Sequence, residues 1–552
     1  MTLISKRKVK HVGPLGSPIL LVAEAPGEDE DFKGEPLVGA SGNVINDILI
    51  LNDLNRKDIR IANRCNYRPN DNEWKYLNDS SQLKESEHEL TEYLTKYKEE
   101  TKVIITLGDK ALSFFGGKYG ISNMRGQPLS TENGFVLPTL HPAYTFYDDT
   151  AFSLITADIA KAKKYLTNPW RQPEHRFRID LPTQELVELV NSFKDRDDII
   201  LQCDIESIKN TTHIRSIQFG WSGMDAVFIP NKTREGISTE FAFVVQLVLS
   251  GKVRKCFQGG SEFDIPMLLL NGFIVENYTD DTQIAEHVLN PAMPKDLASL
   301  NAAYAEEPFW KEDGKQHTEK ELRREDFPIY GCKDVIVPFQ VLTQQLKEMT
   351  KEQEIHYRFK MECALMAIDI SMQGLPVHQE RLRLLKDVHL EKVKTESTIL
   401  NHLCEEVVNV NSNPQMKKLL YEKFSLPPRR QRKGPRKGAI TCDEDAIISL
   451  IPIVKQKIDE SVKKETKEKH AKILYALKTI LNIRGYRKLF SSYFEATISG
   501  DGRMRSIYKV AKPWTDRWSC GLFVDGTGIN AQTMPRGGID VEVERVVRQE
   551  GI

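Results

Sequence analysis

The chain lacks the features that mark a secreted, disulfide-bonded or membrane-spanning protein. Its eight cysteines are scattered and form no Cys-x-x-Cys pair, which argues against a zinc ribbon and a disulfide framework. No apolar run approaches the length of a membrane span, and the first residues, MTLISKRKVKHVGPLGSP, lack the apolar core of a signal peptide. The net charge is only −1, so a nucleic-acid signal must be local. We therefore expect a cytoplasmic protein that makes no membrane contact.

The sequence does contain enough apolar residues to form several hydrophobic cores. Hydrophobic residues make up 40% of 552 residues, and a chain of this length implies about two to four domains. A break rich in proline and arginine falls at 167–183, and before it short apolar runs alternate with helical stretches, which indicates a parallel sheet. The expected strands before the break are 19–23, 58–62, 102–108 and 135–140. Strands are also expected at 197–207 and 216–221, and from about 355 the pattern turns helical, with Val393, Leu400, Leu403 and Val407 on one face.

A loop of small and acidic residues follows the first of these strands. The stretch AEAPGEDEDFKGEPLVGASG (23–42) allows backbone amides to approach a ligand, although any tight loop between a strand and a helix explains it equally well. Three further pieces occur in order: IAN ending at Asn63 and followed by YRP, ITLG at 105–108, and LPTLHPAY carrying His141. Together, over roughly 15–165, they resemble the bacterial four-iron uracil-DNA glycosylases.

The resemblance implies a uracil pocket in this first module. Glu24 and Glu30 would line the pocket mouth, Asn63 would read the edge of a flipped uracil, and His141 would donate a hydrogen bond to the departing base.

Two departures from the family concern stacking and iron. Leu37 stands where the family has a stacking phenylalanine, and Tyr67 stands where it has a cluster cysteine, so we expect no iron–sulfur cluster. Two interpretations stay open: an active glycosylase, or a module that grips DNA and has kept only the fold.

The second module contains four acids in separate contexts. CDIES places Asp204 and Glu206 on the same face of one strand, because side chains alternate along a strand. EFDIPML supplies Asp264, and YGCKD supplies Tyr330 and Asp334, which lie four apart on one face of a helix. Carboxylates that converge from strand and helix suit two divalent cations, Mg²⁺ or Mn²⁺, which can activate a water and stabilise the leaving oxygen of a phosphoryl displacement.

Each of these stretches alone is an ordinary strand end or helix pair, but the ordered set is specific. The pattern DxE, FD and YxxxD across 204–334 resembles the ribonuclease H-like 3′–5′ exonuclease domain of family A DNA polymerases. The resemblance implies that the four acids hold the metal ions and that Tyr330 orients the attacking water. The family often carries Asn where this chain has Gly260, which bears on the substrate pocket and leaves every metal ligand in place. An inactive exonuclease fold is the alternative.

The third module resembles the polymerase region of family A. MECALMAIDISMQGLPV (361–377) resembles its opening helix, and RGYRKLFSSY, with Arg484 and Lys488, resembles the base of the thumb. TDRWS and NAQTMP resemble two later motifs, through which Arg517 and Gln532 would contact primer-template DNA. Asp516 replaces a glycine of the family and is expected to add negative charge beside that DNA.

A basic loop interrupts the helices of this module. The stretch PPRRQRKGPRKG (427–438) holds six cations with no acid between them: Arg429, Arg430, Arg432, Lys433, Arg436 and Lys437. At a thumb tip they would neutralise phosphates without reading sequence, and a solvated surface loop is the alternative.

The sequence as a whole predicts an α/β multidomain protein: a glycosylase-like α/β/α domain with a parallel sheet, an exonuclease domain, and a mainly helical thumb with a truncated palm. The expected boundaries are 1–166 for the first domain, 167–183 for a linker, 184–350 for the exonuclease, 351–500 for the thumb region, and 501–552 for the start of the palm and a tail.

The expected activity is metal-dependent 3′–5′ exonucleolysis of DNA by part of a family A DNA polymerase. The tail offers Asp540 and Glu542 but no fingers segment, so we expect an incomplete polymerase site and no primer extension by this chain alone. A second polypeptide carrying palm and fingers could complete it. The alternatives are a uracil-excision repair enzyme and a non-catalytic DNA-binding partner of such a chain. The fusion resembles polymerases of large tailed phages of Gram-positive bacteria, which would place it in the bacterial host cytoplasm.

Overall fold

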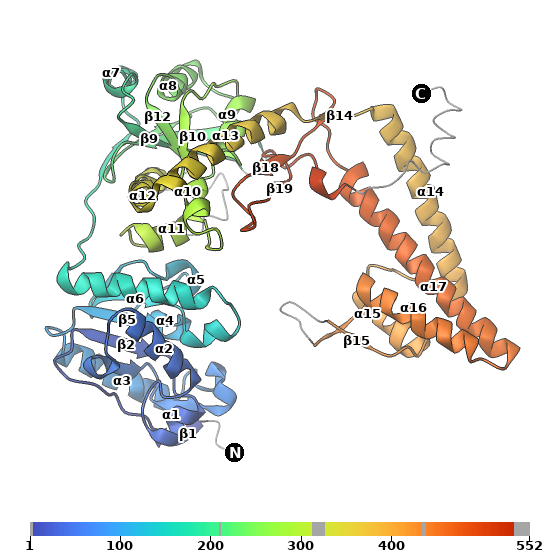
Figure 1. Ribbon diagram of the computed structural model, residues 1–552, viewed down its shortest axis with the longest axis horizontal. Helices are drawn as coiled ribbons and strands as arrows, with labels where there is room; N and C mark the ends of the chain where they lie inside the picture. The colour runs from blue at the N-terminus through green and yellow to red at the C-terminus, as the bar shows by residue number, and fades with distance from the viewer. Residues whose placement is uncertain (1–3, 209–210, 312–325, 432–437, 535–552) are drawn as a thin grey trace. The chain divides into compact units, whose positions relative to one another are not determined.

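The computed structural model describes residues 4–208, 211–311, 326–431 and 438–534. The chain divides into two compact units (Figure 1). The first unit holds residues up to 369 together with 508–519, and the second holds 370–507 and the described residues from 520 onward. The first unit contains two α/β domains, and the described part of the second unit is mainly helical.

The N-terminal domain is built on a five-stranded sheet in the order β3-β2-β5-β7-β6. The strands are β2 (Ile19–Ala23), β3 (Arg60–Asn63), β5 (Val103–Leu107), β6 (Leu129–Thr131) and β7 (Gly134–Thr139). Pairing is parallel except between β6 and β7, so the carboxyl ends of four strands meet at one edge. A separate antiparallel pair joins β1 (Ile4–Lys8) to β4 (Tyr67–Pro69).

Helices cover both faces of this sheet, because its strands are apolar on both sides. Leu20 and Ile104 pack on the face under α3 (Ser81–Lys96) and α4 (Asp109–Phe114), whereas Leu21 and Ile105 pack under α2 (Ala40–Leu51) and α6 (Ala151–Thr167). The remaining short helices are α1 (Glu28–Lys33), α5 (Ile121–Met124), η1 (Arg56–Asp58), η2 (Asn70–Asn72), η3 (Trp74–Tyr76) and η4 (Pro142–Phe146). The result is the predicted α/β/α layering with a parallel sheet.

The second domain has a six-stranded mixed sheet in the order β13-β12-β9-β10-β11-β8. Its strands are β8 (Arg176–Ile179), β9 (Ile200–Ser207), β10 (Ile214–Gly220), β11 (Asp225–Pro230), β12 (Arg254–Phe257) and β13 (Tyr278–Asp281). β9 and β10 form the antiparallel centre, with β12 parallel to β9 and β8 parallel to β11. The segment expected to be a linker therefore contributes an edge strand, since residues 176–179 pair with β11 in register.

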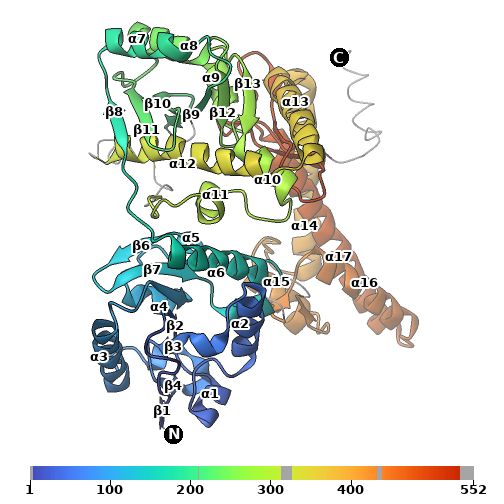
Figure 2. The ribbon, with the colours of Figure 1, turned by 60° about the vertical axis from the view of Figure 1, so that its left-hand side comes forward.

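The helices of the second domain place the site on the sheet. They are α7 (Thr183–Phe193), α8 (Thr239–Leu249), α9 (Asp264–Leu270), α10 (Thr282–Leu289), α11 (Leu297–Tyr304) and α12 (Phe327–Glu348). α12 packs across β9, β10 and β11, and Gly331 allows this close approach, because a Cβ there would lie 3.0 Å from the Phe228 ring. Figure 2 shows α11 lying between α12 and α6.

A long helix, α13 (Lys351–Gln373), leads from the second domain into the second unit. There α17 (Lys464–Leu489) packs against α14 (Gln379–Cys404) and α16 (Glu444–Asp459) around a core that includes Leu400, Leu450 and Leu477. The shorter elements beyond α13 are α15 (Asn413–Lys417), η5 (Lys418–Lys423), η6 (Phe490–Phe494), η7 (Ala531–Thr533), β14 (Leu375–Pro376), β15 (Arg429–Arg430), β16 (Ile440–Thr441), β17 (Arg503–Met504), β18 (Ile507–Lys509) and β19 (Ser519–Gly521). These findings confirm the predicted α/β multidomain class with a helical C-terminal region.

One helical expectation in this unit was wrong. Val407 was expected on the same helical face as Val393, Leu400 and Leu403, but α14 ends at Cys404 and Val407 is 85% exposed. The helix ends because Glu405 takes a left-handed conformation with φ 54°.

None of the helices in the described ranges has both the length and the apolar composition needed to cross a bilayer.

Candidate active sites

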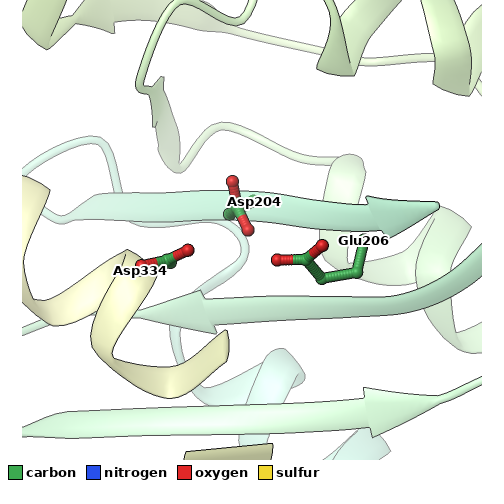
Figure 3. A group of neighbouring side chains, drawn as sticks. All are labelled: Asp204, Glu206 and Asp334. Carbon is green, nitrogen blue, oxygen red and sulfur yellow. The ribbon is translucent and has the colours of Figure 1, made fainter. Parts of the chain in front are cut away.

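An acidic cluster lies on the central strand of the second domain. Asp204 and Glu206 project from the same face of β9, and Asp334 faces them from α12 (Figure 3). One carboxylate oxygen from each residue lies within 4.8 Å of the others, and Glu206 and Asp334 are 7% and 4% exposed. Gln218, the direct partner of Asp204 on β10, donates a hydrogen bond to its carboxylate. The structure thus brings together three acids from two distant stretches of sequence.

The other two predicted residues adjoin this cluster. Asp264, the first residue of α9, accepts a hydrogen bond from the backbone N–H of Ile205 at 3.3 Å, which places it beside the same strand between the two acids of β9. Tyr330 lies one helical turn before Asp334 on α12. Its hydroxyl accepts a hydrogen bond from the ammonium of Lys311 at 3.2 Å.

Two residues at this site were missed by the sequence reasoning. The indole N–H of Trp310 donates to Asp334 Oδ1 at 2.7 Å, and Lys311 Nζ donates to Oδ2 of the same carboxylate at 2.7 Å. Trp310 is 8% exposed, so both contacts are shielded from water. No spacing rule links a Trp-Lys pair to a YxxxD motif some twenty residues later, and only the fold reveals this contact.

The electrostatics of the cluster are unfavourable without added cations. Burial, followed by repulsion from Asp264, Glu206 and Asp334, raises the pKa of Asp204 well above its usual range. Burial and Asp334 raise the pKa of Glu206 to about 8, and burial raises that of Asp264 to about 7. Burial alone would lower the pKa of Lys311, but Asp334 and Tyr330 raise it above its ordinary value.

The residues of the cluster fit divalent cations. Their donors are carboxylate oxygens, which hard cations such as Mg²⁺ and Mn²⁺ prefer. Buried carboxylates that repel each other are stabilised by bound positive charge, and a single lysine cannot balance four of them.

A second polar site forms where the parallel strands of the N-terminal domain end. Glu24 follows β2, Asn63 ends β3, Gly108 follows β5 and His141 lies just after β7, so all four meet at the carboxyl edge of the sheet. Gly108 has φ +93°, and a Cβ there would lie 2.5 Å from Glu24 Oε1 and 3.0 Å from His141 Cβ. The glycine therefore permits the close approach of the glutamate and the histidine, at the edge where open α/β sheets bind ligands.

The two glutamates of this site have different structural roles. Glu30 accepts hydrogen bonds from the backbone N–H groups of Gly27, Val38 and Gly39, so its carboxylate organises the 27–39 loop. Glu24 accepts one from the backbone N–H of Lys110 at 2.9 Å, and burial raises its pKa.

His141 and Asn63 offer hydrogen-bonding groups at this site. Burial lowers the pKa of His141 to about 4, so the imidazole is neutral at neutral pH. Its Nδ1 accepts a hydrogen bond from the Ala143 N–H at 3.2 Å, which assigns the ring proton to Nε2 and makes that nitrogen a donor. Asn63 is 3% exposed, and its side-chain amide bonds to no other part of the described chain, so it retains its donor and acceptor.

The two residues that depart from the glycosylase family lie in ordinary structural roles. Leu37 is 5% exposed in the core with Ile45, and it adopts φ 53°. Tyr67 donates its hydroxyl hydrogen bond to Glu85 at 3.1 Å. A four-cysteine iron–sulfur cluster does not fit here, because the first 172 residues contain one cysteine, Cys65, which is packed against Leu77 and Leu83.

The residues predicted to contact DNA lie in different structural surroundings. Arg484 donates to the carbonyl oxygens of Val410 and Cys442, so its guanidinium braces the helical unit. Arg429 and Arg430 donate to the carbonyl oxygens of Ser449 and Gly438. Lys488, Arg517 and Gln532 are exposed, whereas Arg432, Lys433, Arg436, Lys437, Asp540 and Glu542 lie outside the described residues. The DNA contacts stay predictions. The hydrogen bonds of Arg484 give it a structural role within the helical unit.

The expectation for Asp516 requires correction. Its carboxylate accepts hydrogen bonds from Lys360 Nζ at 2.6 Å and from His287 Nε2 at 2.8 Å, within the first unit. Lys360 and His287 are both buried, so the negative charge of Asp516 is balanced by protein groups and is not free beside DNA. Asp516 has φ 62°, a left-handed conformation that glycine adopts without strain.

The two sites lie in regions that match two separate protein families. Residues 10–172 match the uracil DNA glycosylase superfamily and residues 181–351 match a 3′–5′ exonuclease family. The type-4 uracil-DNA glycosylase of Thermotoga maritima is 33% identical over 161 residues, which are 28% of this chain and 80% of that protein. The enzyme of Saccharolobus solfataricus is 30% identical over 181 residues, and these cover 30% of this chain and 78% of the relative.

The chain therefore belongs to the type-4 uracil-DNA glycosylase family through its N-terminal domain. It also carries a 3′–5′ exonuclease domain. Among solved structures, the POL domain of Pol1 from M. smegmatis in complex with DNA primer-template and dNTP has a TM-score of 0.47 and 17% identity. The match covers 68% of this chain, which spans 58% of that one.

Proposed function

We propose that the chain is a 3′–5′ exonuclease that removes nucleoside monophosphates from DNA ends with the help of Mg²⁺ or Mn²⁺. The observation that carries the proposal is the cluster of Asp204, Glu206 and Asp334, each with one oxygen within 4.8 Å of the others, in a domain of the 3′–5′ exonuclease family. Asp264 adjoins the cluster through its hydrogen bond to Ile205.

Each residue has a role that its position supports. Asp204, Glu206, Asp264 and Asp334 would hold two divalent cations, which when bound supply an activated water and stabilisation of the leaving oxygen. Gln218 and Trp310 fix the orientation of Asp204 and Asp334 through their hydrogen bonds. The hydroxyl of Tyr330, on the same helix as Asp334, would orient the attacking water.

The direct test is the polarity and metal dependence of DNA digestion. We expect the full chain with Mg²⁺ to shorten a 5′-labelled single strand stepwise, and to release a 3′-terminal label as a mononucleotide at once. A chelator should stop both, because the carboxylates cannot supply the positive charge that stabilises the attacking and leaving oxygens, and added Mn²⁺ should restore them. Release from the 5′ end, or digestion that persists in the chelator, would contradict the proposal.

The cellular setting we propose is proofreading within a family A DNA polymerase. The support is the exonuclease family match together with the thumb-like and palm-like motifs of the sequence. In this setting the chain binds single-stranded 3′ ends and primer-template DNA. The domain boundaries, the phage origin and a second polypeptide stay predictions of the sequence.

A second candidate function is uracil excision by the N-terminal domain. It is favoured by the convergence of Glu24, Asn63 and a neutral His141 at one sheet edge, and by relatives that are type-4 uracil-DNA glycosylases. Against it stand the missing aromatic platform at Leu37 and the missing cluster cysteines. Base stacking on an aromatic side chain contributes about 1–3 kcal/mol, so its loss weakens the hold on a flipped base.

We therefore expect weak or absent uracil release with DNA binding retained. A uracil-containing oligonucleotide would be incubated in chelator, so that the exonuclease is silent, and then treated with alkali to cleave abasic sites. Because Leu37 is 5% exposed and packs with Ile45, Leu37→Phe tests whether a ring at this core position raises cleavage. Efficient cleavage by the unaltered chain that disappears in His141→Ala would instead establish the glycosylase.

A further inference from the structure

One short segment contacts both domains of the first unit and ends at the acidic site. Residues 305–311 leave the C-terminus of α11 and end at Trp310 and Lys311, which hold Asp334. The first part of this segment lies against the N-terminal domain, and its last part lies in the exonuclease site. The contacts at its two ends therefore join two domains that belong to different families.

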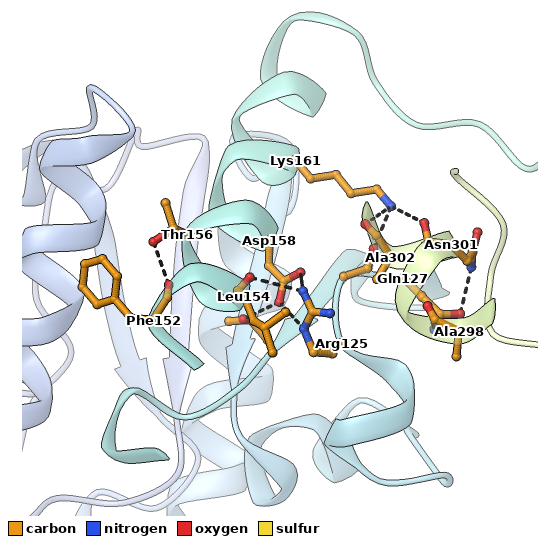
Figure 4. Close-up of polar contacts among 12 residues, drawn as sticks. Arg125, Gln127, Phe152, Leu154, Thr156, Asp158, Lys161, Ala298, Asn301 and Ala302 are labelled. Carbon is orange, nitrogen blue, oxygen red and sulfur yellow. Dashed lines mark hydrogen bonds and ion pairs between the residues drawn. The ribbon is translucent and has the colours of Figure 1, made fainter. Parts of the chain in front are cut away.

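The N-terminal domain holds the start of the segment with a half-buried lysine. Lys161 on α6 donates to the carbonyl oxygens of Ala302 at 2.9 Å and of Ala305 at 2.6 Å, and to that of Asn301 at 3.3 Å (Figure 4). These carbonyls lie at the C-terminal end of α11, where a helix favours a cation. The lysine also donates to Gly126 in its own domain, so it joins backbones from both sides.

A second chain of hydrogen bonds runs parallel to the first. Gln127 donates to the carbonyl of Ala298 and accepts from the fully buried side chain of Asn301 at 3.0 Å. Asn301 in turn bonds to both the N–H and the carbonyl of Glu307, inside the segment. Trp170 donates to the carbonyl of Glu306 at 3.0 Å.

The far end of the segment contacts the helix that carries the site. The buried carboxylate of Glu307 pairs with Lys333 on α12 at 3.4 Å, next to Asp334 in sequence. Trp310 and Lys311 then donate one hydrogen bond to each oxygen of Asp334. The route from Lys161 to Asp334 therefore consists of hydrogen bonds and an ion pair at the two ends of the segment, joined by its backbone from Glu307 to Lys311.

We propose that the N-terminal domain positions the exonuclease site by holding the 305–311 segment, and that Lys311 is the positioning residue through which it acts. The proposal rests on the proposed exonuclease function. Lys311 fixes the carboxylate of Asp334 and the hydroxyl of Tyr330 relative to each other. It also contributes one positive charge near four carboxylates. Two divalent cations would balance the four carboxylates, so the charge of Lys311 would remain to balance the negative charge of the DNA phosphate.

The expected effects differ at the two ends of the segment. Lys311→Met should lower kcat for 3′-end digestion about 10- to 100-fold, as is usual for residues that orient a metal ligand, and Lys311→Arg should recover part of it. Lys161→Met and Gln127→Ala should each lower kcat about three- to tenfold with little change in KM, because they loosen the segment at a distance. Thermal unfolding of each variant shows whether it folds.

The decisive measurement is the coupling between the two lysines. In the Lys161→Met, Lys311→Met double variant, kcat should fall no further than in Lys311→Met alone, because the first change acts only through the second residue. Lys163→Met is the matched control: Lys163 lies on the same helix but bonds to Asn52 and Asp53 within its own domain, so kcat should not change.

A measurement that does not depend on turnover distinguishes the positioning role from the proposed exonuclease function. Mn²⁺ binding to the full chain, followed by electron paramagnetic resonance, should weaken in Lys311→Met and Lys161→Met and remain unchanged in Lys163→Met. This result would support the positioning role even if the unaltered chain digested no DNA, which would refute the proposed function alone. Additive losses in the double variant, or Mn²⁺ binding unaffected by both lysines, would overturn the positioning role.

Discussion

Replacing Asp204 or Asp334 by alanine is expected to reduce 3′-end digestion by roughly 100- to 1,000-fold or more, since each change removes an oxygen ligand from the candidate cation site. Both side chains project into one cluster, from β9 and from α12. The measurement is the rate of mononucleotide release from a labelled single strand at saturating Mg²⁺.

The same variants should still bind DNA, because the changes remove negative charge and leave the exposed cations of the chain untouched. Binding in Ca²⁺ or chelator, measured by fluorescence anisotropy, provides this control. Asp198→Ala is a matched acidic control: its carboxylate pairs with Arg196 on the surface, so digestion should not change. If both cluster variants digest as fast as the unaltered chain, the acids do not form the site.

The elements that the sequence predicted well are those with a strong local signal. β2 and β5 are short β-branched runs buried on both faces, and the structure places them at the centre of a parallel sheet. Asp204 and Glu206 were placed on one face by the alternation of a strand, which holds wherever β9 forms. A helix over 327–348 likewise brings Tyr330 and Asp334 to the same side.

The features that were missed depend on contacts between distant residues. Nothing around Trp310 and Lys311 marks them as partners of Asp334, because the pairing requires α11 and α12 to pack side by side. The same limit explains Asp516, whose partners Lys360 and His287 precede it by more than 150 residues. An acid in a DNA-binding motif suggests repulsion of DNA, unless the fold supplies a buried cation to balance it.

The end of α14 was predicted incorrectly for a different reason. Val407 continues the apolar spacing of α14, but Glu405 turns the chain in a left-handed conformation that glycine or asparagine normally marks. Arg484 illustrates the same limit for a motif. It lies in a stretch predicted to bind DNA, yet its guanidinium donates to backbone carbonyls of the same unit. Periodicity and motif position therefore predict where a residue lies better than what it contacts.

The buried ion pair beside Lys161 carries the largest expected effect on stability. Asp158 is 1% exposed and accepts hydrogen bonds from Arg125 at 2.6 and 3.1 Å and from Thr139 at 2.7 Å (Figure 4). Asp158→Ala should lower the free energy of unfolding of the N-terminal domain by about 3–5 kcal/mol, because it leaves the buried guanidinium of Arg125 without a counter-ion. Since a chain of several domains does not unfold in one step, the measurement is hydrogen exchange of β7 and α6 peptides in increasing urea.

Two further variants separate the loss of the charge pair from the loss of volume. Arg125→Met combined with Asp158→Leu should recover most of the stability, because it removes both buried charges and keeps the site filled. Asp53→Asn is the matched control: Asp53 pairs with Lys163 of α6, its side chain is 90% exposed, and asparagine tolerates its φ of 51°, so loss of this charge should cost under about 1 kcal/mol. Asp158→Ala exchanging no faster than Asp53→Asn would show that the pair contributes little, and that the packing of α6 on the sheet holds this part of the domain without it.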